Sequence, residues 1–258
     1  MDTILFDLDD TLIVEWKSAE ESFIETIAQT DYPVNADEFV RAIRETAREI
    51  WYKLPTIDFC RGIGISSWEG LWADFTGDDE SFKKLRDLSA AYRFETWNQT
   101  LSKFNIHSPE MAHKLSLEFK RIRNTKHILF PETIGVLERL KSLCKLGLIT
   151  NGAPDLQWKK IDGGDLRKYF NYITISGEHG YAKPDQRLFD DALKGLKSEK
   201  SGTVMVGDTL KSDIKGAQDY GLTTIWINRN KKDASEIKPD FEITDLSQIY
   251  KILNDRKR

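Results

Sequence analysis

Residues 3–12 read TILFDLDDTL, and this stretch places two carboxylates where a predicted β-strand ends. The run TILF is typical of a buried strand, and Asp7 and Asp9 follow it closely. Because side chains alternate along a strand, Asp7 and Asp9 are expected on one side of the chain and Asp10 on the other. One carboxylate can then attack an electrophile while the second moves a proton. Taken alone, such acidic residues also fit a solvated turn or a helix cap.

Polar residues follow other strand-like runs in the same way. The run LGLI leads into Thr150 and Asn151, where a hydroxyl and a permissive turn can present donors to an anion. The run TVMV leads into a glycine and Asp208, with Asp213 five residues further on. These two stretches therefore predict an anion site and a second pair of carboxylates.

The run YITIS at 172–176 predicts another strand, and Lys183 follows it within a short distance. Pro184 is expected as the first residue of the next helix, which leaves Lys183 at the helix entrance. In an open parallel sheet, ligands bind beyond the carboxyl ends of the strands, so these scattered sites can converge on one point. Carboxylates with water and substrate oxygens suit Mg²⁺, and a lysine, a hydroxyl and turn amides suit a phosphoryl group.

The motifs DLDDTL, TNG, KPD and GDTLKSD resemble, in order and spacing, the four motifs of the haloacid dehalogenase superfamily. The stretch 204–229 is similar to the phosphatase members of that superfamily. The resemblance covers residues 1–15 and 128–245. It implies a doubly wound, Rossmann-like parallel sheet, and therefore an α/β core.

The resemblance also implies roles for individual side chains. Asp7 is the implied nucleophile, which forms an aspartyl-phosphate, and Asp9 the implied general acid and then base. Thr150, Asn151 and Lys183 are implied to bind the substrate phosphate, and Lys183 also steadies Asp7.

A Mg²⁺ ion is the cofactor that the resemblance implies. It would be held by the Asp7 carboxylate, the Asp9 backbone carbonyl and Asp208. Asp213 would bind it directly or through water. Dehalogenase members lack an acid at the second position, whereas an alkoxide leaving group needs a proton, so Asp9 favours a phosphatase.

The sequence predicts a Mg²⁺-dependent phosphatase that hydrolyses a small phosphorylated metabolite. Phosphomonoester hydrolysis is among the slowest uncatalysed reactions, so nucleophile, acid, metal and positioning are all needed together. Phosphoryl transfer or 2-haloacid dehalogenation on the same scaffold stays open as an alternative. A non-catalytic binding module is a third possibility, although it would not need Asp7, Asp9, Lys183 and Asp208 all intact.

Composition agrees with a globular enzyme. The 258 residues have a mean hydropathy of -0.50 and a net charge of -4, with basic and acidic residues interspersed. Nucleic-acid binding needs a clustered basic face, so no nucleic-acid partner is expected. No run approaches the roughly 18 apolar residues of a membrane span, so no membrane partner is expected either. Either a monomer or a homodimer is compatible with the sequence.

The first residues and the cysteines indicate a cytoplasmic protein. The chain passes from Met1 straight into a strand, without the basic start and apolar region of a signal peptide. Cys60 and Cys144 are two cysteines in a long chain, which favours reduced thiols over a disulfide.

The long gap between the first two motifs predicts an inserted domain. Residues 16–127 carry helical periodicity and helix-start signals at Asn35 and Ser108, so they are expected to form an all-helical cap. Residues 1–15 and 128–258 are expected to form the catalytic core, in which strands and helices alternate. In the superfamily such a cap covers the active site.

Two features of the insert allow both a structural and a functional interpretation. Five of the seven tryptophans lie in it, and packing of a helical bundle is favoured over an aromatic substrate wall. The stretch 59–67 is expected as a loop, in which Arg61 is either an anion contact or a solvated side chain.

Overall fold

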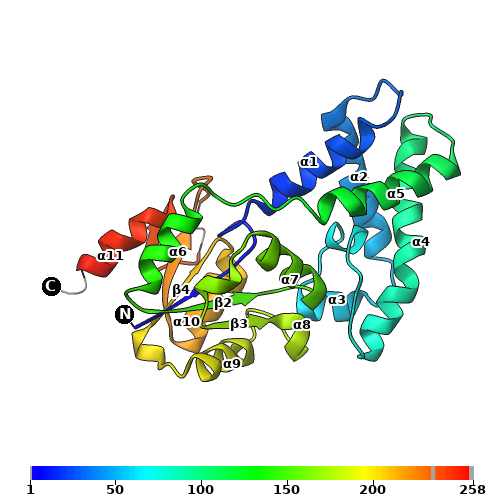
Figure 1. Ribbon diagram of the computed structural model, residues 1–258. Coiled ribbons are helices and arrows are strands. Elements are labelled where there is room, and N and C mark those ends of the chain that lie inside the picture. Colours follow the sequence, from blue (N-terminus) through cyan, green and yellow to red (C-terminus); the bar gives the residue numbers. More distant parts are fainter. Residues whose placement is uncertain (1, 234–235, 256–258) are drawn as a thin grey trace. The chain divides into compact units, whose positions relative to one another are not determined.

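The computed structural model describes residues 2–233 and 236–255 (Figure 1). The chain divides into two compact units. The core unit comprises Met1–Val14, Leu129–Asn151 and Gly164–Arg258. The helical unit comprises Glu15–Ile128 and Gly152–Gly163.

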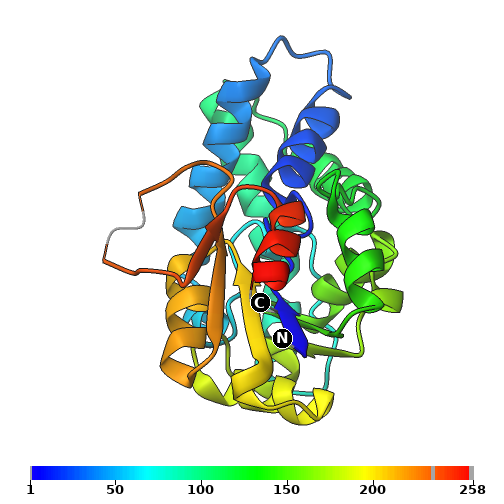
Figure 2. The same cartoon turned by 90° about the vertical axis from the view of Figure 1, so that its left-hand side faces the viewer.

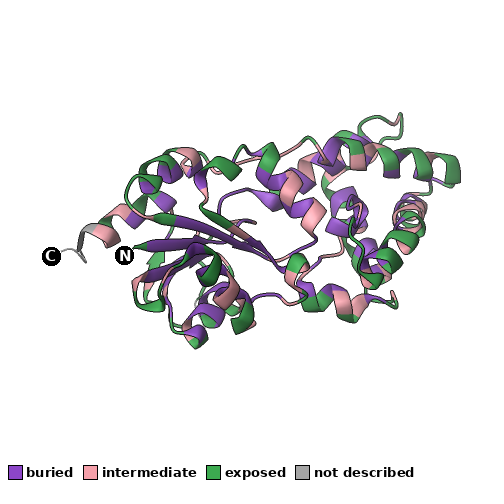
Figure 3. Ribbon diagram, turned by 60° about the horizontal axis from the view of Figure 1, so that its bottom comes forward, coloured by how far each residue is buried: buried purple, intermediate pink, exposed green. Residues whose placement is uncertain are grey.

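A six-stranded parallel sheet forms the centre of the core unit, in the order β3-β2-β1-β4-β5-β6. The strands are β1 (Thr3–Phe6), β2 (Lys145–Thr150), β3 (Tyr172–Ile175), β4 (Thr203–Gly207), β5 (Thr223–Ile227) and β6 (Phe241–Ile243). All residues of β1 and β4 are buried, as expected for parallel strands covered on both faces (Figure 3). The predicted α/β fold is confirmed.

The position of β1 between β2 and β4 creates the switch point of the sheet. Phe6 is in register with Leu148 of β2 and with Val206 of β4. The residues that follow these three strands therefore lie together beyond the carboxyl ends of the strands. In doubly wound folds, ligands bind beyond these carboxyl ends.

Helices cover both faces of the sheet. Leu5, Ile149 and Met205 point to one face, where they form an apolar cluster with residues of α9 and α10. On the opposite face lie α6 and α11 (Figures 1 and 2). The helices of the core unit are α6 (Thr133–Lys141), α8 (Ser176–His179), α9 (Gln186–Leu196), α10 (Gly216–Tyr220) and α11 (Ile249–Asp255), and a π-helical turn over Leu210–Lys215 leads into α10.

The start of α9 differs from the sequence prediction. Pro184 is not the first helical residue, because the helix begins at Gln186. Asp185 is the N-cap, and its carboxylate accepts a hydrogen bond from the Arg187 N–H at 2.9 Å. An aspartate cap satisfies an otherwise unpaired backbone donor, and here it shifts the helix start past the proline.

Helices alone form the helical unit: the structure describes all of 15–128 and 152–163, and no β-strand occurs in either range. Asn35 and Ser108 are N-caps as predicted, accepting hydrogen bonds from the N–H groups of Glu38 and Met111. The helices are α1 (Glu15–Ile27), α2 (Ala36–Trp51), α3 (Ile57–Ile63), α4 (Glu80–Lys103), α5 (Pro109–Arg123) and α7 (Pro154–Gly163).

Aromatic side chains fill much of the interior of this unit. Phe23 stacks on Phe119 with ring centroids 4.2 Å apart, and Trp97 is fully buried beside both. Trp51 and Trp72 are buried as well, whereas Trp16 is exposed and Trp68 is only partly buried, so the packing interpretation fits three of the five tryptophans of the insert.

The expected loop over residues 59–67 is wrong in its first half. Residues 59–63 belong to α3, which ends at Gly64 with φ of +78°. The Ile65 N–H closes this helix end by donating to the Cys60 carbonyl oxygen at 2.8 Å. A glycine in the left-handed region is a common helix terminator, so Gly64 marked the end of a helix rather than a flexible stretch.

A buried charge network holds α7 within the helical unit. The Lys160 ammonium lies 2.9 Å from a Glu69 carboxylate oxygen and 3.7 Å from one of Glu15. Arg123 pairs with the other oxygen of Glu15. The sequence pattern predicts 152–163 as part of the core, whereas in the structure this segment groups with the helices of the insert.

Two further expectations concern cysteines and membranes. Cys60 and Cys144 are free thiols, as predicted. Among the helices that the structure describes, none has the length and apolar character needed to cross a membrane.

Candidate active site

A tight turn after β1 sets the position of Asp7. The Asp7 N–H donates to the Val206 carbonyl oxygen of β4 at 2.9 Å, although β1 itself ends at Phe6. Asp10 then turns the chain with φ of +57°. The strand-like pairing thus continues past β1 through Asp7, and the chain turns at Asp10, while the expected placement of Asp7 and Asp9 on one side of the chain stays a prediction.

Both carboxylate oxygens of Asp7 are held by side chains. Its Oδ1 accepts a hydrogen bond from the Lys183 ammonium at 2.6 Å, and its Oδ2 accepts one from the Thr11 hydroxyl at 3.1 Å. All three side chains are buried. Thr11 belongs to the first motif, but the sequence indicates no role for it, because only the turn brings its hydroxyl back to Asp7.

Lys183 is held at three points. Its ammonium donates to Asp7 and to the Ile149 carbonyl oxygen at 2.8 Å, and it lies 2.8 Å from Asp213 Oδ1. An ammonium has three protons, so these contacts use its whole capacity. A phosphate contact from Lys183 would require one of them to be exchanged, and that contact stays a prediction.

The Asn151 side chain fixes the backbone of Lys183. Its amide nitrogen donates to the Lys183 carbonyl oxygen at 3.0 Å, and its amide oxygen accepts from the Lys183 N–H at 2.9 Å. This reciprocal pair explains why an asparagine is useful after β2: it joins the second motif to the third. The predicted phosphate contact of Asn151 stays untested.

The fourth motif is shaped by a close backbone turn. The Thr209 N–H donates to Asp213 Oδ2 at 3.0 Å, and the Thr209 hydroxyl donates to Asp208 Oδ1 at 3.1 Å. A side chain at Gly207 would meet Asp213 atoms at 2.5 Å, so glycine is required there. The Trp226 indole donates to the Asp208 carbonyl oxygen at 2.8 Å and supports the same turn from β5.

Three of the predicted acidic residues lie together. Carboxylate oxygens of Asp7, Asp208 and Asp213 lie within 4.8 Å of one another. Burial raises the pKa of Asp7 well above its ordinary value, and it raises the pKa of Asp208 to about 7, with Asp213 adding to both shifts. Burial opposes the Lys183 ammonium, but Asp213 and Asp7 outweigh it and the pKa of Lys183 is raised.

This cluster fits a divalent cation. Three carboxylates and one ammonium leave an excess of negative charge, which burial makes costly unless a proton or a cation neutralises it. The donors are all oxygen atoms, the ligand type that Mg²⁺ prefers. Asp7, Asp208 and Asp213 therefore have the chemistry and the proximity to hold such an ion.

The two remaining predicted site residues, Asp9 and Thr150, follow β1 and end β2, respectively. Asp9 is partly exposed and pairs with Ile13 in an isolated bridge that follows the turn. Thr150 is the buried last residue of β2. The acid–base role of Asp9 and the phosphate contact of Thr150 stay predictions.

The site combines a buried, oriented carboxylate, Asp7, with a partly exposed one, Asp9. Asp7 is buried and oriented through both oxygens, which suits a nucleophile more than a solvated turn. Asp9, two residues away, has access to solvent, as a residue that exchanges protons with water requires.

Comparison with known proteins is consistent with this chemistry. A family model described as haloacid dehalogenase-like hydrolase matches residues 1–221. A phosphoserine phosphatase of Thermus thermophilus is 30% identical over 252 residues, which cover 97% of this chain and 98% of that protein.

Solved structures with the same fold include proteins of different names. HAD-hydrolase YfnB from Bacillus subtilis, described as bound to magnesium, superposes with a TM-score of 0.68 at 24% identity, covering 98% of each chain. A 2-haloacid dehalogenase from Pseudomonas syringae gives a TM-score of 0.61 at 26% identity, covering 99% of each chain.

Proposed function

This chain belongs to the haloacid dehalogenase-like hydrolases, and we propose that it is a Mg²⁺-dependent phosphatase of a small phosphomonoester. The observation that carries the proposal is the Asp7 carboxylate, held by Lys183 and Thr11 beside two further carboxylates. The similarity to a phosphatase over nearly the whole chain supports it.

In the proposed reaction, an Asp7 oxygen attacks phosphorus and the bond from phosphorus to the leaving oxygen breaks. Asp9 gives its proton to that leaving oxygen, so the product departs as a neutral alcohol. The intermediate is an aspartyl-phosphate on Asp7. Asp9 then removes a proton from water, and the water oxygen attacks phosphorus and releases phosphate and the free Asp7 carboxylate.

Lys183 and Asn151 act on this reaction by positioning. Lys183 stabilises the charged form of Asp7, which must be an anion to attack. Asn151 keeps Lys183 in place through two hydrogen bonds to its backbone. Thr11 fixes the second oxygen of Asp7, so the carboxylate has little rotational freedom left to lose in the transition state.

Asp7, Asp208 and Asp213 would hold Mg²⁺, which when bound supplies positive charge against the negative phosphoryl group. The carboxylates alone would repel a phosphate, because Lys183 balances only one of them. Asp208 and Asp213 each accept a hydrogen bond from Thr209, which holds both carboxylates in place.

Asp9 distinguishes this function from dehalogenation. A halide leaves without a proton, whereas an alkoxide requires one, so an acid two residues after the nucleophile is useful only for the second reaction. The fold similarity to a 2-haloacid dehalogenase makes this distinction necessary.

Leaving-group dependence tests the proposal. With an alkyl phosphate, Asp9→Asn should lower kcat by about 10²–10⁴, the usual size of general acid–base catalysis. With an acidic phenol as leaving group, the first step should lose much less, and phosphoenzyme should accumulate as a mass increase on the Asp7 peptide after acid quenching.

Asp7→Asn is the matched control, because it should form no phosphoenzyme with either substrate. Wild-type turnover should disappear after EDTA treatment and return with Mg²⁺. Unchanged alkyl phosphate turnover in Asp9→Asn, or a phosphate label on another residue, would contradict the proposal.

A further inference from the structure

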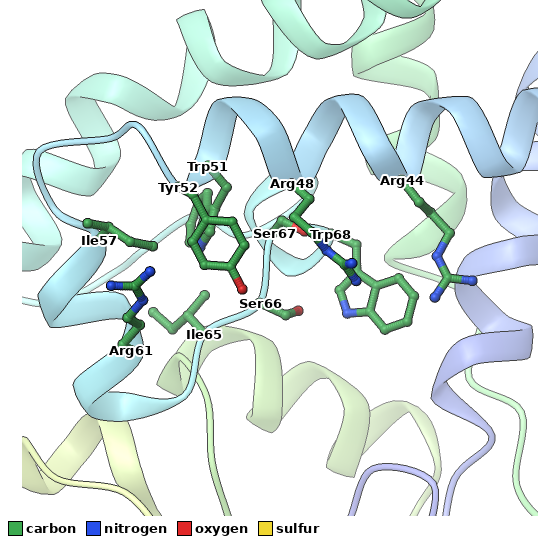
Figure 4. Close-up of a pocket in the computed structure, with 10 residues that line it drawn as sticks. All are labelled: Arg44, Arg48, Trp51, Tyr52, Ile57, Arg61, Ile65, Ser66, Ser67 and Trp68. Carbon is green, nitrogen blue, oxygen red and sulfur yellow. The ribbon is translucent and has the colours of Figure 1, made fainter.

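We propose that a pocket within the helical unit binds a small organic anion, namely one planar ring that carries a phosphonate, phosphate or carboxylate group. The pocket lies between α2, α3 and the segment 65–68 (Figure 4). It contains none of the residues of the Asp7 cluster. All of its lining residues belong to the helical unit, whereas Asp7, Asp208 and Asp213 belong to the core unit.

The charge of the pocket favours an anion. Arg44 and Arg48 are one turn apart on α2, and Arg61 comes from α3 (Figure 4). Among the described residues, no aspartate or glutamate lines the pocket. Guanidinium groups bind carboxylates and phosphates through paired hydrogen bonds, so three of them around one hollow form a suitable anion site.

The three arginines differ in the contacts that their guanidinium groups make with other side chains. Arg44 lies over the Trp68 ring at 4.3 Å, which holds its guanidinium at the rim. Arg61 lies over the Tyr52 ring at 5.1 Å, and its ion pair with the exposed Asp58 is long at 3.7 Å. Within the described part of the chain, Arg48 has no hydrogen-bond or ion-pair partner for its side chain. Arg48 is thus the cation most available to a ligand.

The wall opposite α2 is already rigid. The Glu69 carboxylate accepts hydrogen bonds from both the N–H and the hydroxyl of Ser66, at 2.8 and 2.9 Å. The Tyr92 hydroxyl donates to the Ser67 carbonyl oxygen from the interior of the unit. A wall fixed in this way loses little conformational entropy when a ligand binds.

The floor of the pocket accepts a flat apolar group. Trp51 is buried there, and Gly70 passes so closely beneath it that an added Cβ would lie 2.3 Å from the indole ring. Ile57 and Ile65 complete the apolar lining. A ring can thus contact apolar and aromatic side chains while its anionic group reaches the arginines.

The size of the pocket limits the ligand to a single ring. Its volume is about 170 Å³. Sites for drug-sized ligands measure roughly 300–1,000 Å³, so a much smaller molecule is expected. A mononuclear aromatic acid or phosphonate matches this volume together with the charge and the floor.

Phenylphosphonate is a suitable probe, because its carbon–phosphorus bond resists phosphoester hydrolysis. Calorimetric titration of the full chain in EDTA should show binding to the wild type. Arg48→Met, which keeps most of the stem and removes the charge, should raise Kd about tenfold, equivalent to about 1.4 kcal/mol. Inorganic phosphate and benzyl alcohol, which each lack one half of the probe, should both bind more weakly than phenylphosphonate.

Arg41→Met is the matched control, since Arg41 is an exposed residue of the same helix that does not line the pocket. It should leave Kd unchanged. Phenylglyoxal modification followed by peptide mass mapping locates the site independently: the probe should protect Arg48 but not Arg41. Turnover of a generic aryl phosphate by Arg48→Met should stay at the wild-type level and serves as the folding control.

Three results would overturn the inference. They are wild-type binding weaker than about 1 mM, an equal Kd for wild type and Arg48→Met, or equal losses in Arg48→Met and Arg41→Met. Because the titration measures no turnover, such a failure would leave the proposed phosphatase function untouched.

Discussion

Replacing Lys183 by methionine should lower the unfolding free energy of the core unit by about 4 kcal/mol at pH 7, and by much less at pH 5. The ammonium lies within hydrogen-bonding distance of Asp7, Asp213 and the Ile149 carbonyl oxygen, and all three charged side chains are buried. Methionine fills most of the same space, so the change removes charge rather than volume.

The magnitude follows from what the orphaned carboxyls can do. Removing one partner of a buried ion pair costs about 3–5 kcal/mol when the remaining charge stays ionised. The folded protein can instead protonate one more carboxyl, which costs about 1.4 kcal/mol for each pH unit above its ordinary pKa near 3.9. Protonation therefore limits the decrease in unfolding free energy to about 4 kcal/mol at pH 7 and about 1.5 kcal/mol at pH 5.

The sign of the pH dependence is fixed by the direction of the shift. Burial already raises the pKa of Asp7 above its unfolded value, and removing the Lys183 ammonium, which lowers it, raises the folded pKa of Asp7 further. The folded state then binds the proton more tightly, so the deficit is absent below about pH 4 and grows as the pH increases. Wild type and variant should therefore converge in stability on acidification.

Urea unfolding in EDTA at several pH values measures this deficit. Because the chain has two compact units, amide hydrogen exchange of β1 and β4 peptides should assign the transition to the core unit. Lys194→Met is the matched control, since Lys194 is exposed and its ion pair with Asp190 should contribute little at any pH. A deficit of equal size at pH 5 and pH 8 would refute the electrostatic argument and indicate lost packing instead.

Three further predictions address the cation, the charge network and the asparagine clamp. Mg²⁺ at about one hundred times its Kd should stabilise the wild type by about 2.7 kcal/mol in thermal scans, and Asp208→Ala should abolish this shift; a full shift in the variant would exclude Asp208 as a ligand. Lys160→Met should destabilise the helical unit by about 3 kcal/mol in urea unfolding, because Glu69 stays buried without its cation. Adding Glu69→Gln should restore most of this stability, and a double variant no more stable than Lys160→Met would argue against the prediction. Asn151→Ala should lower kcat about tenfold, since two hydrogen bonds that hold Lys183 are worth about 1–3 kcal/mol, while the Mg²⁺ shift persists; an unchanged kcat would contradict the positioning role.

Much of the fold could be predicted because its signals are local. Short runs of β-branched and leucine residues end in polar residues, and this pattern predicted the strands and the edge at which they meet. Asp7, Asp208 and Asp213 were found together for the same reason, since parallel strands bring the residues after them to one edge.

The contacts that orient these side chains could not be predicted. Thr11 reaches Asp7 through a turn, Asn151 reaches Lys183 across thirty-two positions of sequence, and Trp226 supports Asp208 from the next strand. Periodicity indicates which face a residue occupies, but it carries no information on such tertiary hydrogen bonds.

Lys160 shows the same limit for the division into units. A lysine in an amphipathic helix is normally expected at the surface, whereas Lys160 is completely buried between carboxylates of Glu15 and Glu69. Nothing local to 154–163 indicated that this helix would pack with residues about 90 to 145 positions earlier.

The membership of α7 in the helical unit bears on how such enzymes can be recombined. A chimera that exchanged only residues 15–128 for those of a relative without acids at positions 15 and 69 would remove both carboxylates from the buried Lys160 ammonium. The transplantable module is discontinuous, so a functional graft has to carry 152–163 as well. For the same reason, substitutions at position 160 are expected to be tolerated only together with changes at positions 15 or 69, which couples two distant parts of the gene.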